Sequence, residues 1–201
     1  LQVAVAEGRV GSVSVEGNKW FHTKLLQHYL DMRKGDILNY DRLRQNVRFI
    51  NENPDIASSV VLARGEDRGE TDIIAKVDDS FPVHATVGYN NYNSKYLEHN
   101  KYLLELETTN FLLLGHRLSG EIQLGEGGKY DLYSARYLGP LHPRHAIGGY
   151  YIHLNQRLGR EVGPLSIKGQ GDIFNLSYSF TAFENENINF NINPSFTYKD
   201  I

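Results

Sequence analysis

The chain has 201 residues, and its 21 Lys and Arg against 24 Asp and Glu give a formal net charge of −3. This balance excludes a protein that binds nucleic acid through a strongly basic surface, and the absence of cysteine excludes disulfides and thiol chemistry. The 19 Gly, 13 Tyr and 9 Phe favour many strands and turns over a helical bundle.

The beginning of the chain mixes strand and helix periods. Alternation over residues 9–15 predicts a first strand, which ends at the turn residues Gly17 and Asn18. Apolar residues at helical spacing over 21–30 predict a helix that ends near Lys34 and Gly35. Asn39 is expected to cap a second helix. The apolar face of this helix consists of Tyr40, Leu43, Val47 and Ile50.

Two short strands are predicted next, at 56–63 and 71–77, separated by an exposed turn rich in glycine and charge. The order over residues 9–80 is therefore β-α-α-β-β. Two amphipathic helices covering one face of a small sheet make an independent α+β module. Residues 1–8 are interpreted as the end of a similar, preceding unit.

The helical period disappears after Ser80, and residues 81–201 alternate between apolar and polar side chains. This pattern predicts about seven antiparallel strands, at 83–91, 99–110, 117–124, 132–137, 146–155, 174–180 and 188–198. The mean hydropathy of −0.44 would normally indicate a soluble protein. Because only every second residue of a membrane barrel strand meets lipid, the average does not exclude an outer-membrane barrel.

The composition of the two strand faces separates the possible β folds. The polar positions are rich in Asn, Ser, Thr and Gln and hold few charges, which suits a watery barrel interior. A soluble β-sandwich or a lipocalin-like barrel is the alternative, although a sandwich exposes more Lys and Glu. In the fifth strand the predicted apolar face consists of Ala146, Gly148, Tyr150, Ile152 and Leu154.

Several segments together resemble one family. Residues 3–18, the helix junction at 33–43 and the segment 50–54 are similar to the second POTRA domain of the TpsB transporters. These are the outer-membrane pores of two-partner secretion, of the haemolysin-activator and filamentous-haemagglutinin exporter type. Residues 109–119 and 133–141 resemble periplasmic turns of the family's barrel. The resemblance follows the family's order over nearly the whole chain.

The resemblance implies a fragment of a bacterial outer-membrane transporter. We expect the end of one POTRA domain at 1–8, a second at 9–80 and the first part of the barrel at 81–201. With the POTRA domain in the periplasm, 93–100, 126–128 and 157–169 become external loops, and 111–115, 139–145 and 184–186 become periplasmic turns. Seven strands cannot close a barrel, so this piece should not translocate anything by itself.

The resemblance also implies how a client protein binds. An unfolded, secreted client, which folds as a β-helix after export, would pair with the exposed POTRA edge strand at 56–63. The candidate client-binding residues are Ile56, Ser58, Val60, Leu62, Val47 and Ile50. The alternative is that this strand completes a small sheet and that Val47 and Ile50 are core residues.

A second set of residues is predicted to line the barrel interior. The candidate pore-lining residues are Glu105, Glu107, Arg117, Glu121 and Arg136. Interior charges that pair can equally brace a barrel wall. Outer-membrane lipids are the other expected partner, and no nucleic acid is expected.

No enzyme, cofactor or metal is predicted. His142 and His145 lie in an expected turn without a third ligand nearby. Glu105 and Glu107 share a strand face but no catalytic cleft is indicated. Two other functions stay open, an insertase of the same superfamily and a β-rich binding protein that transports nothing. The sequence upstream of this piece would distinguish an insertase from an exporter. Heat-sensitive migration on gels would test whether the full-length protein is a membrane barrel and not a binding protein.

Overall fold

The computed structural model describes residues 8–92, 99–157, 168–184 and 188–201. Two compact units divide the chain, one formed by Leu1–Pro82 with Leu112–Gly115 and the other by Val83–Phe111 with His116–Ile201. The unit predicted at residues 1–8 lies almost entirely outside the described residues. Among the described residues, no helix is long and apolar enough to span a membrane.

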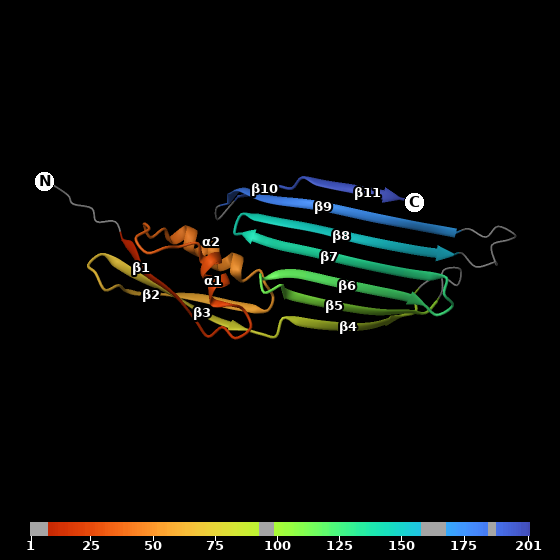
Figure 1. The fold of residues 1–201 in the computed structure, drawn as a ribbon, viewed down its shortest axis with the longest axis horizontal. Coiled ribbons are helices and arrows are strands. Elements are labelled where there is room, and N and C mark those ends of the chain that lie inside the picture. The colour runs from red at the N-terminus through yellow and green to blue at the C-terminus, as the bar shows by residue number, and fades with distance from the viewer. Residues whose placement is uncertain (1–7, 93–98, 158–167, 185–187) are drawn as a thin grey trace. The chain divides into compact units, whose positions relative to one another are not determined.

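The first unit contains a three-stranded sheet with two helices (Figure 1). Strand β1 (Arg9–Glu16) pairs in parallel with β3 (Glu70–Asp79). Strand β2 (Ile56–Arg64) pairs with β3 on its other side, in antiparallel orientation. The sheet order β1-β3-β2 places β3 in the centre and leaves β1 and β2 as the two edges.

Helix α1 (Thr23–Leu30) is shorter than its sequence pattern predicts, whereas α2 (Tyr40–Ile50) begins where expected. The Asn39 side chain accepts a hydrogen bond from the Arg42 backbone N–H at 3.0 Å, which confirms the predicted cap. Helix α1 ends before Lys34 because Asp31 adopts a left-handed conformation, with φ 45°. That residue forms an ion pair with Arg42 of α2, and this fixes the turn.

One hydrophobic core joins both helices to one face of this sheet. Phe21 precedes α1 but is buried with the helix residues. The buried cluster consists of Val10, Phe21, Leu26, Tyr29, Leu30, Met32, Leu43, Ile50, Ile56, Ile73, Ala75 and Val77. Strand β3 contributes alternate residues to this cluster, as the two-residue period of a half-buried strand requires.

The carboxylate of Asp79 holds the loop between β1 and α1 against the end of β3. It accepts hydrogen bonds from the backbone N–H groups of Lys19, Trp20 and Phe21 at 2.8 to 3.0 Å. Asp79 is buried, so these charged acceptors satisfy three donors that would otherwise lie unpaired. This contact ties the entry of α1 to the central strand.

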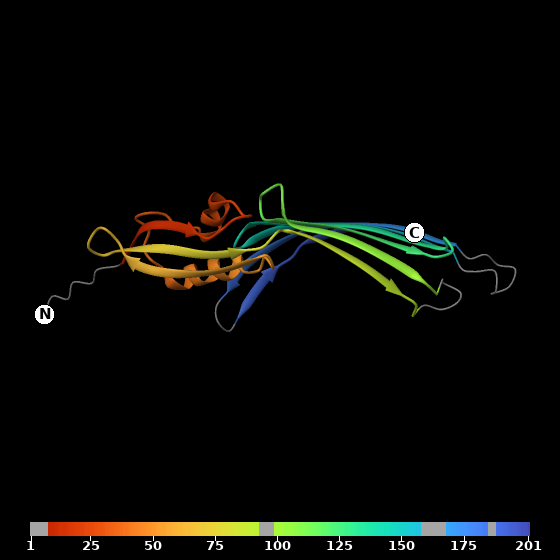
Figure 2. The same ribbon diagram turned by 90° about the horizontal axis from the view of Figure 1, so that it is seen from below.

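The second unit is a curved antiparallel sheet (Figures 1 and 2). Its strands are β4 (Val83–Asn90), β5 (Lys101–Phe111), β6 (His116–Gly125), β7 (Tyr130–His142), β8 (His145–Arg157), β9 (Lys168–Glu184), β10 (Asn189–Ile192) and β11 (Ser195–Asp200). Each of β4 to β9 pairs with its neighbour in sequence, and both β10 and β11 pair with β9. The predicted α+β module followed by an open sheet of antiparallel strands is confirmed.

The seventh predicted strand is divided into β10 and β11 at Pro194. Ile192 lies opposite Phe180, and Ser195 lies opposite Ser177, so the register along β9 is the same on both sides of the proline. Proline has no N–H to donate, which interrupts the ladder locally without shifting it. The carbonyl of Pro194 still accepts from the Tyr178 N–H at 3.0 Å.

The predicted turn at 139–145 is wrong, because β7 continues to His142 and β8 begins at His145. Glycine and proline in this segment suggested a long turn, but Gly139 lies opposite Ile147 and Pro140 opposite Ala146 within the ladder. The predicted turns at 111–115 and 126–128 coincide with the breaks between β5 and β6 and between β6 and β7. Residues 93–98, 158–167 and 185–187 lie outside the described residues.

Replacement of Asp79 by Ala should lower the unfolding free energy of this unit by about 2–4 kcal/mol, because three backbone donors lose a charged acceptor. Trp20, the single tryptophan of the sequence, lies in the affected loop and packs edge-on against Phe81. Urea unfolding followed by its fluorescence measures the change. Asp78→Ala, at the exposed neighbouring position, should change the unfolding free energy by less than about 0.5 kcal/mol. Equal effects of the two substitutions would contradict this role of Asp79.

Candidate functional site: the open edge of the first sheet and the two faces of the second

The edge of β1 is largely closed by the segment that joins the two helices. Val10 donates its N–H to Asp36 O at 2.9 Å and accepts from Gly35 N at 2.8 Å. Gln27 adds a hydrogen bond from its side chain to Val13 O at 3.2 Å. An added strand would have to displace these contacts along most of β1.

The edge of β2 is closed at one end only, by the residues that follow α2. The Ser58 N–H donates to Asn51 Oδ1 at 2.6 Å, and Asn51 Nδ2 donates to Ser58 O at 3.0 Å. The Ile56 N–H donates to Asn53 O at 3.1 Å. The outward backbone groups of Ser58 and the N–H of Ile56 are thus occupied.

The remaining part of β2 is open. In an antiparallel pair, backbone groups alternate between the partner strand and the free side. Gly65, which follows β2 directly, donates its N–H to Glu70 O of β3, so the odd-numbered residues bond to β3. Ser58 bonds outward, so the even-numbered residues of β2 present their backbone groups on the free side. Among the described residues, none forms a hydrogen bond with the outward backbone groups of Val60 or Leu62.

The candidate client-binding side chains divide between core and surface. Ile50 and Ile56 are 2% and 6% exposed, so their side chains belong to the core. Val47 and Val60 are partly buried against the same cluster. Ser58 is half-buried, and Leu62 is exposed by 40%. A ligand at this edge would therefore meet backbone groups and Leu62 before any other member of the set.

Sequence reasoning missed Asn51, the residue that covers Ser58. Its position just after the second helix gave no indication of a contact with the edge strand. The available signal was the amide side chain of Asn51, seven residues before Ser58 of the edge strand. The sequence alone does not show that these two residues are in contact. The short connection between α2 and β2 brings them together.

One face of the second sheet is apolar across nearly all of its strands. The register joins Val87 to Leu104 and Leu104 to Ile122, and it continues along this row to Tyr133. Other members of this face are Ala85, Tyr89, Tyr102, Leu106, Leu118, Leu124, Ala135, Tyr137, Tyr151, Phe174, Leu176, Phe180, Ile192, Phe196 and Tyr198. Val87 is 82% exposed and Phe196 63%. An exposed apolar surface of this extent indicates contact with lipid or protein.

Polar residues bound this apolar face at one end of the strands. His153 Nδ1 lies 2.8 Å from Asp172 Oδ1, and the Tyr151 hydroxyl donates to the same oxygen at 2.6 Å. Asp131 and Asn155 lie opposite one another at the same end. The change from apolar to polar side chains is what a strand needs where it leaves hydrocarbon for an aqueous interface.

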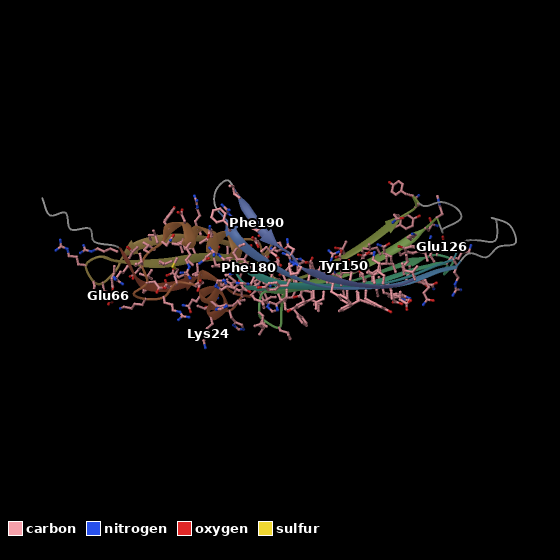
Figure 3. The ribbon with its side chains drawn as sticks, turned by 90° about the horizontal axis from the view of Figure 1, so that it is seen from above. Lys24, Glu66, Glu126, Tyr150, Phe180 and Phe190 are labelled. Atoms are coloured by element: carbon pink, nitrogen blue, oxygen red, sulfur yellow. The ribbon has the colours of Figure 1, made fainter. Side chains whose placement is uncertain are left out.

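The predicted apolar set of the fifth strand lies on the other face. Gly149 pairs with Tyr137 and Leu176, whereas Tyr150 pairs with Arg136 and Asn175. Tyr150 and Phe180, both labelled in Figure 3, are thus on opposite faces. The prediction was wrong because the middle of β8 is apolar on both sides, with Ile147 and Tyr151 on one and Tyr150 and Ile152 on the other, so alternation alone does not identify its outward face.

The five candidate pore-lining residues share the face opposite the apolar one. Arg117 Nε lies 3.6 Å from Glu107 Oε1, so these two side chains form an ion pair. Glu105 and Glu121 occupy directly opposite positions on β5 and β6. Glu121 also accepts a hydrogen bond from Gln123. Arg136 lies opposite Ser119 on the same face.

The two histidines singled out by sequence flank the tight turn between β7 and β8. Their ring centroids are 6.0 Å apart, and His145 Nδ1 lies 2.5 Å from the Tyr178 hydroxyl. No group of three or more His, Asp or Glu in the described ranges could hold a metal ion.

Comparison with known proteins identifies the first module. Residues 8–79 match the POTRA family, described as "Surface antigen variable number repeat". No curated protein matches the sequence. Among solved structures, CdiB from Escherichia coli matches with a TM-score of 0.79 and 17% identity, over 96% of this chain and 37% of that one.

Two further structures share the arrangement. CdiB from Acinetobacter baumannii matches with a TM-score of 0.71 and 19% identity, over 96% of this chain and 38% of that one. BamA from Haemophilus ducreyi, lacking POTRA domains 1–3, matches with a TM-score of 0.62 and 15% identity, over 96% and 36%. The chain thus spans little more than a third of these proteins. Residues 8–79 are therefore a POTRA domain, and the chain shares the fold of the matched parts of CdiB and BamA, with that domain followed by an open antiparallel sheet.

Proposed function

We propose that this chain is part of an outer-membrane pore that exports a protein in two-partner secretion, with its POTRA domain in the periplasm. The fold shared with CdiB, which is of the TpsB type, supports this proposal together with the resemblance of the sequence to that family. The client is an unfolded polypeptide that folds as a β-helix after export. The partner of the second sheet is the lipid of the outer membrane.

The observation that carries this proposal is the open stretch of β2. Val60 and Leu62 present backbone donors and acceptors that an extended polypeptide can pair with, whereas on β1 the outward groups of Val10 and the carbonyl of Val13 are occupied. Main-chain hydrogen bonds do not depend on the client's side chains. Different segments of one unfolded client could therefore pair with β2 one after another during export.

The second sheet supports the membrane part of the proposal. Strands β5 and β6 have 11 and 10 residues, close to the roughly 9–11 that a tilted strand needs to cross an outer membrane. The apolar row through Leu104 would face lipid, and the opposite face would line the interior. We propose that Glu105, Glu107, Arg117, Glu121 and Arg136 line the export route. The Arg117 and Glu107 pair would also brace the wall.

A second candidate function is insertion of other proteins into the outer membrane, which the fold shared with BamA supports. Both CdiB structures match with higher TM-scores, so we favour export. Depletion of the full-length protein separates the two functions. Loss of one secreted protein would support export, and a general loss of barrel proteins from the outer membrane would support insertion.

Replacement of Val60 by Pro should slow client export by about fivefold, because it removes one outward N–H from β2 without breaking a bond to β3. Val15→Pro is the matched control. Val15 is also a partly buried valine, and its N–H faces outward on β1. Export by the full-length protein is measured as client released per unit time.

The control keeps this export test specific. If Val60→Pro and Val15→Pro slow export equally, the loss reflects damage to the POTRA fold and not an open edge. Normal export by Val60→Pro at normal protein level would contradict client binding along β2.

Replacement of Leu104 by Arg should impair insertion of the full-length barrel, because a lipid-facing Arg costs about 2–4 kcal/mol at the bilayer midplane. Leu103→Arg introduces the same charge one residue earlier, on the opposite face, and should insert normally. The folded fraction is read from heat-dependent migration on unboiled gels. Equal insertion of both variants would contradict a lipid-facing row.

A further inference from the structure

Asn51 occupies the β2 edge in the way that a neighbouring strand would. Its Oδ1 accepts the Ser58 N–H at 2.6 Å, and its Nδ2 donates to Ser58 O at 3.0 Å. A paired strand offers the same combination of one acceptor and one donor to each outward residue. The Ser58 hydroxyl donates to the same Oδ1 at 2.8 Å, so the side chain has three hydrogen bonds to one residue.

The position of Asn51 is fixed by its own backbone. Its N–H donates to Val47 O at 3.1 Å, which makes it the residue that ends α2. The orientation of the amide follows from the partners, since Ser58 N–H can only donate and Ser58 O can only accept. The carboxamide is therefore held against the edge strand by a helix end and not by a chance side-chain position.

This contact limits the length of edge that a client can use. Ile56 donates its N–H to Asn53, and Ser58 is occupied by Asn51. The outward positions that remain lie between Val60 and Arg64. The exposed Leu62 lies within this stretch, which favours a client segment with apolar residues at alternate positions.

We propose that Asn51 is a strand stop, which ends the pairing of a client segment with β2 at Val60 and so keeps each bound segment to about five residues. The occupant is an extended segment of the client polypeptide, because the carboxamide already present shows which donor and acceptor pattern the edge takes. This inference rests on the proposed client binding along β2. A short paired segment releases easily, which suits a polypeptide that has to move on.

The test measures binding of peptides of increasing length to the full-length protein in detergent. The probes are fluorescein-labelled peptides of alternating Thr and Val with five, seven and nine residues. For the natural sequence, the dissociation constant should stop improving beyond five residues. In Asn51→Ala the seven-residue peptide should bind about tenfold tighter than the five-residue one, since the two outward groups of Ser58 become available.

Glu52→Ala is the matched control, because it changes the exposed neighbouring side chain in the same turn. It should show the length dependence of the natural protein. Peptides methylated on alternate backbone nitrogens, in either register, complete the set. One of these two methylated peptides should not bind, because its methyl groups replace the N–H hydrogens that face β2.

The outcomes separate this proposal from the proposed function. If the five-residue peptide binds, Val60→Pro weakens it and Asn51→Ala brings no gain with length, then the edge binds clients but Asn51 is no stop. If no peptide binds any variant, client pairing along β2 is overturned, and the stop with it. If Asn51→Ala instead dimerises without peptide, the occupant of the edge is a second copy and the proposal is overturned.

Discussion

Extended backbone must find hydrogen-bond partners on both sides, and this requirement shapes both units. In the POTRA domain, the connection between the helices covers β1, and the residues after α2 cover one end of β2. The helices therefore do more than cover one face of the sheet. Their ends also close part of both edges, and the uncovered stretch at Val60 and Leu62 is the site that we propose for the client.

The same requirement would be stricter for the second sheet in the proposed membrane location, because hydrocarbon offers no water to an unpaired backbone group. Strand β4 and the pair β10 and β11 form the two edges of this sheet. The proposed membrane location therefore requires partner strands beside both. Pro194 is tolerated at an outer position because it removes a donor without shifting the register along β9 between Ile192 and Ser195.

Local signals in the sequence were sufficient for most elements. Helix α2 could be placed from Asn39 and its apolar spacing, because both are short-range features. The early end of α1 could not, since it depends on the contact between Asp31 and Arg42. The role of Asn51 was missed for the same reason. The outward face of β8 required the register with β7, because its own residues are apolar on both sides.

The corrected assignment of the two faces of β8 also changes which side chains line the proposed barrel interior. On β5 and β6 this face holds Glu105, Glu107 and Arg117, whereas on β7 to β9 it places Leu132, Tyr150, Ile152, Leu154 and Ile173 beside the polar Arg136, Asn175 and Ser177. One part of the face is charged and the other mixes apolar with polar side chains, so the face is not uniformly suited to water. Successive side chains of an extended client point to opposite sides. A route with two such parts could contact apolar and polar side chains of the client at once, whereas a uniformly polar route would disfavour the apolar ones.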